Sequence, residues 1–220
     1  MSAQVKKEAN KVSAILSSYM IYLVLIIMVI AISILSGGKF LKITNILNVL
    51  RQVTITGTLA IGMTLVLITG GIDLSVGSVM AIAGVVAADL AHADGGIPLG
   101  ASIMAGVGIG LLFGAANGVL IAYIKAPAFI VTLGMQSVSR GIAYIYTQGS
   151  PIINLSDAYL FIGKGTIFGI PFPVYIFVLF IIFNVYILHY SKMGRYIYAI
   201  GNNEAAAIAS DVKTKLVKLY

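Results

Sequence analysis

The feature that most constrains this chain is a polar, glycine-rich segment, GGIDLSVGS (Gly70–Ser78), between two apolar stretches. The interior of a lipid bilayer contains no water, so every backbone N–H and C=O group there must be satisfied within the protein. Two adjacent glycines, an aspartate and two serines are residues that a lipid-facing helix avoids. Such a segment is tolerated where protein surrounds it, or where it faces a polar cavity or the membrane surface. We therefore expect a discontinuous or tightly turning region at residues 70–78, of the kind found in membrane transporters.

The composition places this region inside a polytopic membrane protein. Hydrophobic residues make up 60% of the 220 positions and charged residues 10%, whereas soluble domains carry roughly 25% charged residues. The net charge of +7 does not indicate a nucleic-acid partner, because most basic residues lie at the ends of apolar stretches, where they set orientation in the membrane. The chain has no cysteine and only two histidines, which excludes disulfides and thiolate sites, and we expect no metal site.

Six apolar stretches predict an all-α fold with about six transmembrane helices. A helix needs about 20 mostly apolar residues to cross a bilayer. The six stretches are residues 17–36, 53–69, 77–91, 101–124, 129–147 and 170–190. The second and third are short, so one discontinuous crossing with a re-entrant piece is the alternative there. We treat residues 1–220 as a single transmembrane domain in contact with membrane lipid, with a cytoplasmic tail at 1–16 and a cytoplasmic loop at 191–220.

Apolar residues recur at helical spacing just after the first stretch, at Ile43, Ile46, Leu47 and Leu50. Polar and basic residues fill the positions between them. This period predicts a short amphipathic helix at residues 40–52 that lies in the outer membrane interface. A flexible loop is the alternative.

The distribution of basic residues favours six crossings with both ends of the chain in the cytoplasm. Under that topology nine basic residues fall inside: Lys6, Lys7, Lys11, Lys125, Lys192, Arg195, Lys213, Lys215 and Lys218. Four fall outside: Lys39, Lys42, Arg51 and Lys164. Lysine and arginine concentrate on the cytoplasmic side of membrane proteins, so this difference supports the topology.

Four glycines recur at every fourth position of the fourth stretch: Gly106, Gly110, Gly114 and Gly118. Small residues in register leave a bare stripe along one face of a helix, where a second helix can approach closely. The stripe therefore predicts helix packing. A direct role in binding a ligand is the alternative.

Asp73 and Arg140 are the charged residues that bear most directly on function. A charge within a membrane is costly, so it requires a partner or a wet cavity and commonly marks a substrate pathway. For Asp73 the alternative is structural, because Asp73 or Ser75 stands where it can cap the next helix. For Arg140 the alternative is an ion pair that locks helices together, with Asp73 or Asp89 as its partner.

Amides within the apolar stretches extend the predicted pathway. Asn117 and Gln136 can hydrogen-bond a neutral polar solute, although joining helices is the commoner use of such residues. The predicted substrate-pathway residues are Asp73, Ser75, Asn117, Gln136 and Arg140. We predict no catalytic residue and no cofactor, because no Ser-His-Asp arrangement can be assembled and no GxxxxGK[ST] loop is present to bind ATP.

The second informative segment is SKMGRYIYAIGNNEAAAIASDVKTK, residues 191–215. The tripeptide Gly201-Asn202-Asn203 interrupts it. Either asparagine can cap a helix that begins with Glu204, whose carboxylate the helix dipole favours in the first turn. A short helix of small residues outside the membrane has a suitable shape for insertion into a groove on a partner. An ordinary connecting loop is the alternative.

Three segments together carry a resemblance to a known family: GMTLVLITGGIDLSVGSVMAIAG (62–84), AFIVTLGMQSVSRGIAYIYTQGSPI (128–152) and MGRYIYAIGNNEAAAIASDVK (193–213). They resemble the membrane permease subunit of bacterial ABC sugar importers, the ribose-type permeases that also include xylose, galactose and autoinducer-2 carriers. The resemblance extends from residue 17 to the C-terminus.

The resemblance implies a multi-pass permease of the bacterial cell membrane that translocates a monosaccharide or a related small polar solute. It implies three protein partners: a cytoplasmic ATP-binding subunit that hydrolyses ATP, an extracytoplasmic solute-binding protein, and a second permease subunit in a homodimer. Residues 194–211 match the family's loop that couples to the ATPase, which favours insertion over a plain connector. The coupling residues are then Gly194, Arg195, Gly201, Asn202, Asn203, Glu204, Ala205 and Ala206.

The chain departs from this family in length. The family's permeases continue into further spans and a second glycine-rich motif, so we expect this chain to be a fragment whose independent transport is in question. Two other functions remain as alternatives. One is a secondary transporter driven by an ion gradient, because Asp73 lies beside a broken helix. The other is a membrane fragment that transports nothing.

Overall fold

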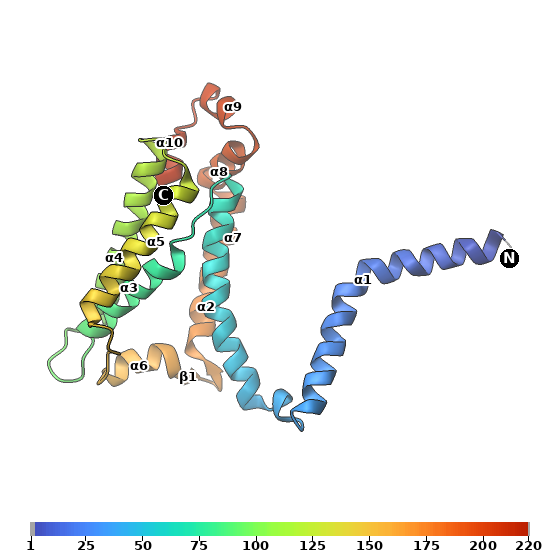
Figure 1. Ribbon diagram of the computed structural model, residues 1–220, viewed down its shortest axis with the longest axis horizontal. Helices are drawn as coiled ribbons and strands as arrows, with labels where there is room; N and C mark the ends of the chain where they lie inside the picture. Colours follow the sequence, from blue (N-terminus) through green and yellow to red (C-terminus); the bar gives the residue numbers. More distant parts are fainter. Residues whose placement is uncertain (1–2, 220) are drawn as a thin grey trace. The chain divides into compact units, whose positions relative to one another are not determined.

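The computed structural model describes residues 3–219, with side chains from Tyr19 onward (Figure 1). The described residues do not include Met1, Ser2 and Tyr220, which belong to the two predicted cytoplasmic ends. The side chains of the three lysines of the predicted tail also lie outside the described part. The chain divides into two units, one that ends at Leu50 and one that begins at Arg51. Each unit is described by itself.

The first unit holds α1 (Ala3–Leu35), the 3-10 helix η1 (Lys39–Leu41) and the beginning of α2 (Ile43–Ile68). α1 contains nearly all of the predicted stretch 17–36, which has no charge and no proline to interrupt a helix. The helix is followed by Gly37 and Gly38, whose φ angles are +59° and +76°, a left-handed conformation that glycine adopts without steric cost. Ser36 Oγ accepts a hydrogen bond from the backbone N–H of Phe40 at 3.1 Å and holds this turn.

α2 differs from the sequence prediction. The prediction divided this part of the chain into an interfacial helix at 40–52 and a membrane span from residue 53. The structure instead has one continuous helix from Ile43 to Ile68, so the predicted boundary at residue 52 is wrong. The reason is local: no glycine or proline occurs between Ile43 and Thr56, and nothing there interrupts the helical hydrogen bonds.

Three helices of the second unit pack against one another: α3 (Val76–Leu90), α4 (Leu99–Ala122) and α5 (Ala128–Thr147) (Figure 1). α4 and α5 each begin directly after a proline, Pro98 and Pro127, because a proline disfavours helical backbone at the residue before it. α5 ends at Thr147, and its C-cap residue Gln148 has φ +52°. The hydrophobic stretches predicted at 101–124 and 129–147 therefore correspond closely to helices.

A short segment after α5 carries α6 (Asp157–Lys164) and an antiparallel hairpin of β1 (Thr166–Ile167) and β2 (Ile170–Pro171). The register pairs Thr166 with Pro171 and Ile167 with Ile170. Phe168 and Gly169 between the strands have φ angles of +49° and +78°, as a two-residue type I′ turn requires. The sequence did not predict this hairpin, because strands of two residues show no alternating pattern. α7 (Phe172–Tyr190) follows directly.

Three short helices complete the described chain: α8 (Lys192–Asn202), α9 (Glu204–Ala209) and α10 (Thr214–Leu219). Their buried apolar residues form a small hydrophobic core of Ile197, Ile200, Ala207 and Val217. Leu65 and Ile68 of α2 and Leu188 of α7 pack against this core. The three helices therefore fold onto the C-terminal ends of α2 and α7.

Within the part of the chain that the structure describes, four helices are long and apolar enough to cross a membrane, namely α2, α4, α5 and α7, and two shorter apolar helices lie at Tyr19–Leu35 and in α3. Most of the large hydrophobic side chains on these helices are exposed, which suits a surface that faces lipid rather than water. The prediction of an all-α polytopic membrane protein is confirmed, with a small hairpin in addition.

α2 and α3 run in opposite directions within the second unit. The end of α2, at Ile68, packs against the core of the three short helices. α10 of that group lies against α4 near Gly118, and Ser75, which precedes α3, hydrogen-bonds the neighbouring Asn117. The end of α2 and the start of α3 therefore lie at the same end of this unit.

Candidate functional site

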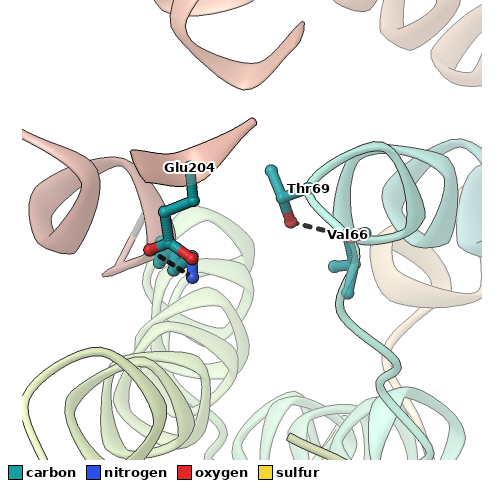
Figure 2. Close-up of polar contacts among 4 residues, drawn as sticks. Val66, Thr69 and Glu204 are labelled. Atoms are coloured by element: carbon teal, nitrogen blue, oxygen red, sulfur yellow. Dashed lines mark hydrogen bonds and ion pairs between the residues drawn. The ribbon is translucent and has the colours of Figure 1, made fainter. Parts of the chain in front are cut away.

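The polar segment predicted at residues 70–78 is a break between α2 and α3. α2 ends at Ile68 with two backbone hydrogen bonds, from Gly70 N–H to Leu67 C=O and from Gly71 N–H to Val66 C=O, each 3.0 Å long. These two bonds form a Schellman motif, and the φ angle of +80° at Gly70 explains why glycine occupies that position. Figure 2 shows Thr69, which adds a third bond by donating its hydroxyl to the Val66 carbonyl at 2.8 Å.

Beyond the break, a network of polar side chains joins the start of α3 to α4 and α5. Asp73 Oδ1 accepts hydrogen bonds from the backbone N–H of Ser75 at 2.7 Å and from its hydroxyl at 2.6 Å. Asn117 of α4 donates from Nδ2 to Ser75 Oγ at 2.9 Å. The Thr132 hydroxyl of α5 lies 3.2 Å from the Ile72 carbonyl and 2.8 Å from the Ala128 carbonyl of its own helix, so it can donate to either. We call Asp73, Ser75, Asn117 and Thr132 the start cluster.

The start cluster differs from an ordinary helix cap. Ser75 is the N-cap residue of α3, but its side chain makes no hydrogen bond to the N–H groups of the helix. Asp73 bonds to Ser75 itself and not to the first turn. The exposed fractions are 1% for Ser75, 6% for Asn117 and 1% for Thr132, so these three residues are buried, whereas Asp73 is partly exposed. The capping alternative for Asp73 and Ser75 therefore does not describe their hydrogen bonds.

The structure does not bring Arg140 to this cluster. Arg140 lies eight residues beyond Thr132 on α5, which places it about 12 Å further along the helix axis. Its side chain is exposed, and within residues 3–219 it takes part in no hydrogen bond or ion pair. The expected ion pair with Asp73 or Asp89 is absent from the described chain. Gln136, one turn after Thr132, is partly buried. The pathway roles of both residues stay predictions.

A second polar cluster lies at the other end of α3. Asp89 Oδ2 accepts a hydrogen bond from the Tyr146 hydroxyl of α5 at 2.6 Å, and Asp89 Oδ1 lies 3.6 Å from Nε2 of His92. The three residues, which we call the end cluster, line an open pocket of about 230 Å³ together with Thr147, Ser150 and residues 151–153. Sequence reasoning named Asp89 but missed Tyr146, because the two are 57 positions apart and no local pattern links them.

The four glycines of α4 have different surroundings. A Cβ added at Gly106 would lie 3.0 Å from the Ala83 carbonyl oxygen and 3.0 Å from the Ala87 Cβ of α3, and one at Gly118 would meet Leu219 of α10. A Cβ at Gly110 or Gly114 would have nothing within 4 Å among the described residues. Each step of four residues rotates the position by about 40° around the helix, so the stripe turns from α3 towards α10. The packing role of the full stripe stays a prediction.

The predicted helix in the end segment is present. α9 begins at Glu204, and Asn203 is its N-cap, with Oδ1 accepting a hydrogen bond from Ala206 N–H at 3.0 Å. Figure 2 shows the Glu204 carboxylate, which forms a 2.7 Å ion pair with Lys218 of α10. The prediction of a short helix starting near Asn202 or Asn203 is therefore confirmed.

The part of the segment before Asn203 is helical rather than a loop. α8 buries Gly194, Ile197 and Ile200 and exposes the other face. Two glycines allow this packing: a Cβ at Gly194 would collide with the carbonyl oxygens of Ile187 and Leu188, and one at Gly201 would collide with that of Ile68. The sequence suggested a chain break at Gly201, whereas the structure shows a close approach of α8 to the end of α2. The predicted coupling residues on the exposed side are Arg195, Asn202, Asn203, Glu204, Ala205 and Ala206.

Comparison with known proteins identifies relatives along most of the chain. The family model described as branched-chain amino acid transport system / permease component matches residues 45–220. The chain is 38% identical over 203 residues to the ribose import permease protein RbsC of Escherichia coli K12, covering 89% of this chain and 62% of that protein. It is 43% identical over 200 residues to RbsC of Bacillus subtilis, with 90% and 61% covered.

A third relative differs in the sugar that its name gives. The fructose import permease protein FrcC of Rhizobium meliloti is 35% identical over 208 residues, which cover 90% of this chain and 58% of that protein. The chain thus spans about three fifths of the length of these curated relatives. No solved structure shows a significant match.

Proposed function

The chain belongs to the family of branched-chain amino acid transport system permease components, and on that premise we propose that it acts in the membrane permease subunit of an ATP-binding-cassette importer. The cargo is a monosaccharide or a related small polar solute, carried into a bacterial cell. The observation that carries this proposal is the similarity to import permeases for ribose and fructose along some nine tenths of the chain. ATP hydrolysis belongs to a partner subunit, and the permease itself is not an enzyme.

In this proposal the polar route for the solute runs past the start cluster. Ser75 and Asn117 are polar groups buried in an apolar bundle, and Asp73, which bonds Ser75, is partly exposed. A buried polar group without a hydrogen bond lowers the stability of the fold. Gln136 and Arg140 extend the polar positions along α5. Their one shared property is that each is polar within or beside an apolar stretch, and intramembrane polar residues of this kind commonly mark a pathway.

The end segment is proposed as the contact for the ATP-binding subunit, on the cytoplasmic side. Its exposed residues Ala205 and Ala206 are small enough to enter a groove, and Glu204 supplies a charge at the rim. α8 touches the end of α2 through Gly201 and Ile68, one residue before the turn that leads to the break. A displacement of α8 by the ATPase would therefore reach the α2–α3 break through direct contact.

Two further partners follow from the same proposal. An extracytoplasmic solute-binding protein would dock at the opposite end of the second unit, where the end cluster and the β1–β2 hairpin lie. A second permease subunit would form a homodimer. Gly110 and Gly114 have nothing within 4 Å among the described residues, so they are available for close contact with further helices.

Cysteine crosslinking tests the proposed partner and its side of the membrane. The chain contains no cysteine, so single cysteines at positions 203–208 can be introduced into the full-length permease and purified with its ATP-binding subunit. We expect these positions to form crosslinks to the ATPase, whereas a control cysteine at Ser150 of the end-cluster pocket does not. Crosslinks from neither site, or from Ser150 alone, would contradict the proposed contact.

A further inference from the structure

Asn117 carries a buried hydrogen-bond acceptor that the described protein does not use. Its side chain is 6% exposed, and its Oδ1 atom has no hydrogen-bond partner among residues 3–219. Leaving a buried polar atom unpaired costs about 1–3 kcal/mol. Such atoms are rare in folded proteins and call for a specific explanation.

The hydrogen-bond network fixes which atom of the Asn117 amide is unpaired. A serine hydroxyl has one hydrogen, and that of Ser75 is already donated to Asp73 Oδ1 at 2.6 Å. Ser75 Oγ can therefore only accept from Asn117, which places the amide NH2 group at the 2.9 Å contact. Rotating the amide by half a turn would set two acceptors against each other, so the oxygen must face away from Ser75.

Other groups at the start of α3 also have no partner in the described chain. Both hydrogen bonds to Asp73 end on Oδ1, which leaves Oδ2 without a partner in the described chain. The first N–H groups of α3, at Val76 and Gly77, cannot be bonded within their own helix. The start of α3 thus combines acceptors with donors in one place.

This combination selects among ligands by charge. An anion would be repelled by the Asp73 carboxylate, and the relatives are named for the import of neutral sugars rather than cations. A neutral hydroxyl group suits both sets, since it donates one hydrogen bond and accepts others. The unpaired amide oxygen of Asn117 is a hydrogen-bond acceptor, so its partner must be a hydrogen-bond donor.

We propose that Asn117 Oδ1 binds a hydroxyl group of a neutral polyol solute, with Asp73 and the start of α3 completing the subsite. The inference rests on the proposed function and names the atom of the pathway that recognises the solute. Asn117 Oδ1 is covered in this conformation, so the hydroxyl reaches it only after the groups that cover it shift.

A chemical double-mutant cycle tests the subsite. The full-length permease is reconstituted in proteoliposomes with its ATP-binding subunit and binding protein, and uptake of D-ribose is compared with uptake of its single-deoxy analogues. The variant is Asn117→Leu, and Asn117→Ala is measured in the same way so that the test does not depend on one variant folding. For each solute only the ratio of variant to wild-type uptake is used, because that ratio cancels the preference of the binding protein.

We expect Asn117→Leu to lower D-ribose uptake about tenfold, the effect of losing one hydrogen bond of about 1.4 kcal/mol. One deoxy analogue should show a ratio near unity, because it lacks the hydroxyl that Asn117 binds. The matched control is Asn184→Leu on α7: Asn184 is 5% exposed and its Nδ2 donates to the Phe180 carbonyl of its own helix at 2.8 Å. That control should change uptake of all solutes by one common factor.

Equal ratios for D-ribose and every analogue in both Asn117 variants would overturn the subsite and assign the acceptor to a buried water. A wild-type permease without ATP-dependent uptake of any sugar would instead refute the proposed function, and the subsite with it. The two failures are therefore distinguishable in one set of measurements.

Discussion

The two ends of α3 use the same residue type in opposite surroundings. At the start cluster, Asp73 holds Ser75, which in turn accepts from Asn117, and Ser75 and Asn117 are buried. At the end cluster, Asp89 holds the Tyr146 hydroxyl at the rim of an open pocket, and its own side chain is 41% exposed. An aspartate therefore lies at each end of this helix: Asp73 is partly exposed but bonds the buried Ser75, whereas Asp89 bonds a tyrosine that solvent reaches.

The difference shows which polar contacts fix the position of α3. Inside the protein the effective dielectric is low, so a hydrogen bond is stronger and an unpaired group is more costly. At the exposed end, water competes for each group, and such contacts contribute little. We infer that the hydrogen bonds of the start cluster set the position of α3. Those of the end cluster are weaker and allow the pocket to change shape.

The largest effect is expected where α3 and α4 touch between the two clusters. Gly106→Leu places a bulky side chain where even a Cβ lies 3.0 Å from the Ala83 carbonyl oxygen. Overpacking at such a contact should lower the free energy of unfolding by about 3 kcal/mol and disturb both clusters together. Thermal unfolding in detergent measures the loss. The matched control is Gly108→Leu on the same helix, where an added Cβ meets nothing within 4 Å; equal melting temperatures for the two variants would refute the close contact.

A smaller loss is expected from the start cluster alone. Ser75→Ala removes the hydroxyl that joins Asp73 to Asn117, and it leaves the Asn117 amide without its partner. The free energy of unfolding should fall by about 1–2 kcal/mol. The control is Ser102→Ala: Ser102 is 0% exposed, but its hydroxyl bonds only the Leu99 carbonyl of its own helix. An equal loss of unfolding free energy for Ser102→Ala and Ser75→Ala in the same assay would contradict this expectation. It would show that the hydrogen bonds of Ser75 between helices stabilise the protein no more than a bond within one helix.

The smallest effect is expected from the end cluster. Tyr146→Phe removes the hydrogen bond to Asp89 in a site that solvent reaches. The loss should be about 0.5 kcal/mol, close to that of the control Tyr144→Phe, whose side chain is exposed. A loss as large as that of Ser75→Ala would show that both ends of α3 are fixed equally, and the comparison between them would fail.

The sequence predicted most helices because the apolar stretches have sharp limits. Pro98, Pro127 and Pro171 each precede a helix, and the Schellman turn at Gly70 ends another. The failure at residues 40–52 has the opposite cause, since the change from amphipathic to apolar sequence there involves no residue that interrupts a helix. Composition alone does not end a helix.

The candidate site was predictable residue by residue but not as an arrangement. Asp73, Ser75 and Asn117 stood out as polar residues in apolar surroundings, yet Ser75 and Asn117 are 42 positions apart and nothing local joins them. For Arg140 the rule that a membrane charge requires a partner led to an expected ion pair that the described chain does not contain. The asparagine cap of α9 was predictable, because capping depends on neighbours in sequence.

ATP-dependent sugar uptake is the direct test of the proposed transport function. The full-length permease is reconstituted with its ATP-binding subunit and binding protein, and uptake of D-ribose, D-xylose and D-fructose is measured. We expect uptake of at least one of these sugars that requires ATP hydrolysis and persists when ionophores collapse the ion gradients. Uptake that continues with a hydrolysis-deficient ATP-binding subunit and stops with the ionophores would contradict it, because it would identify a transporter driven by an ion gradient.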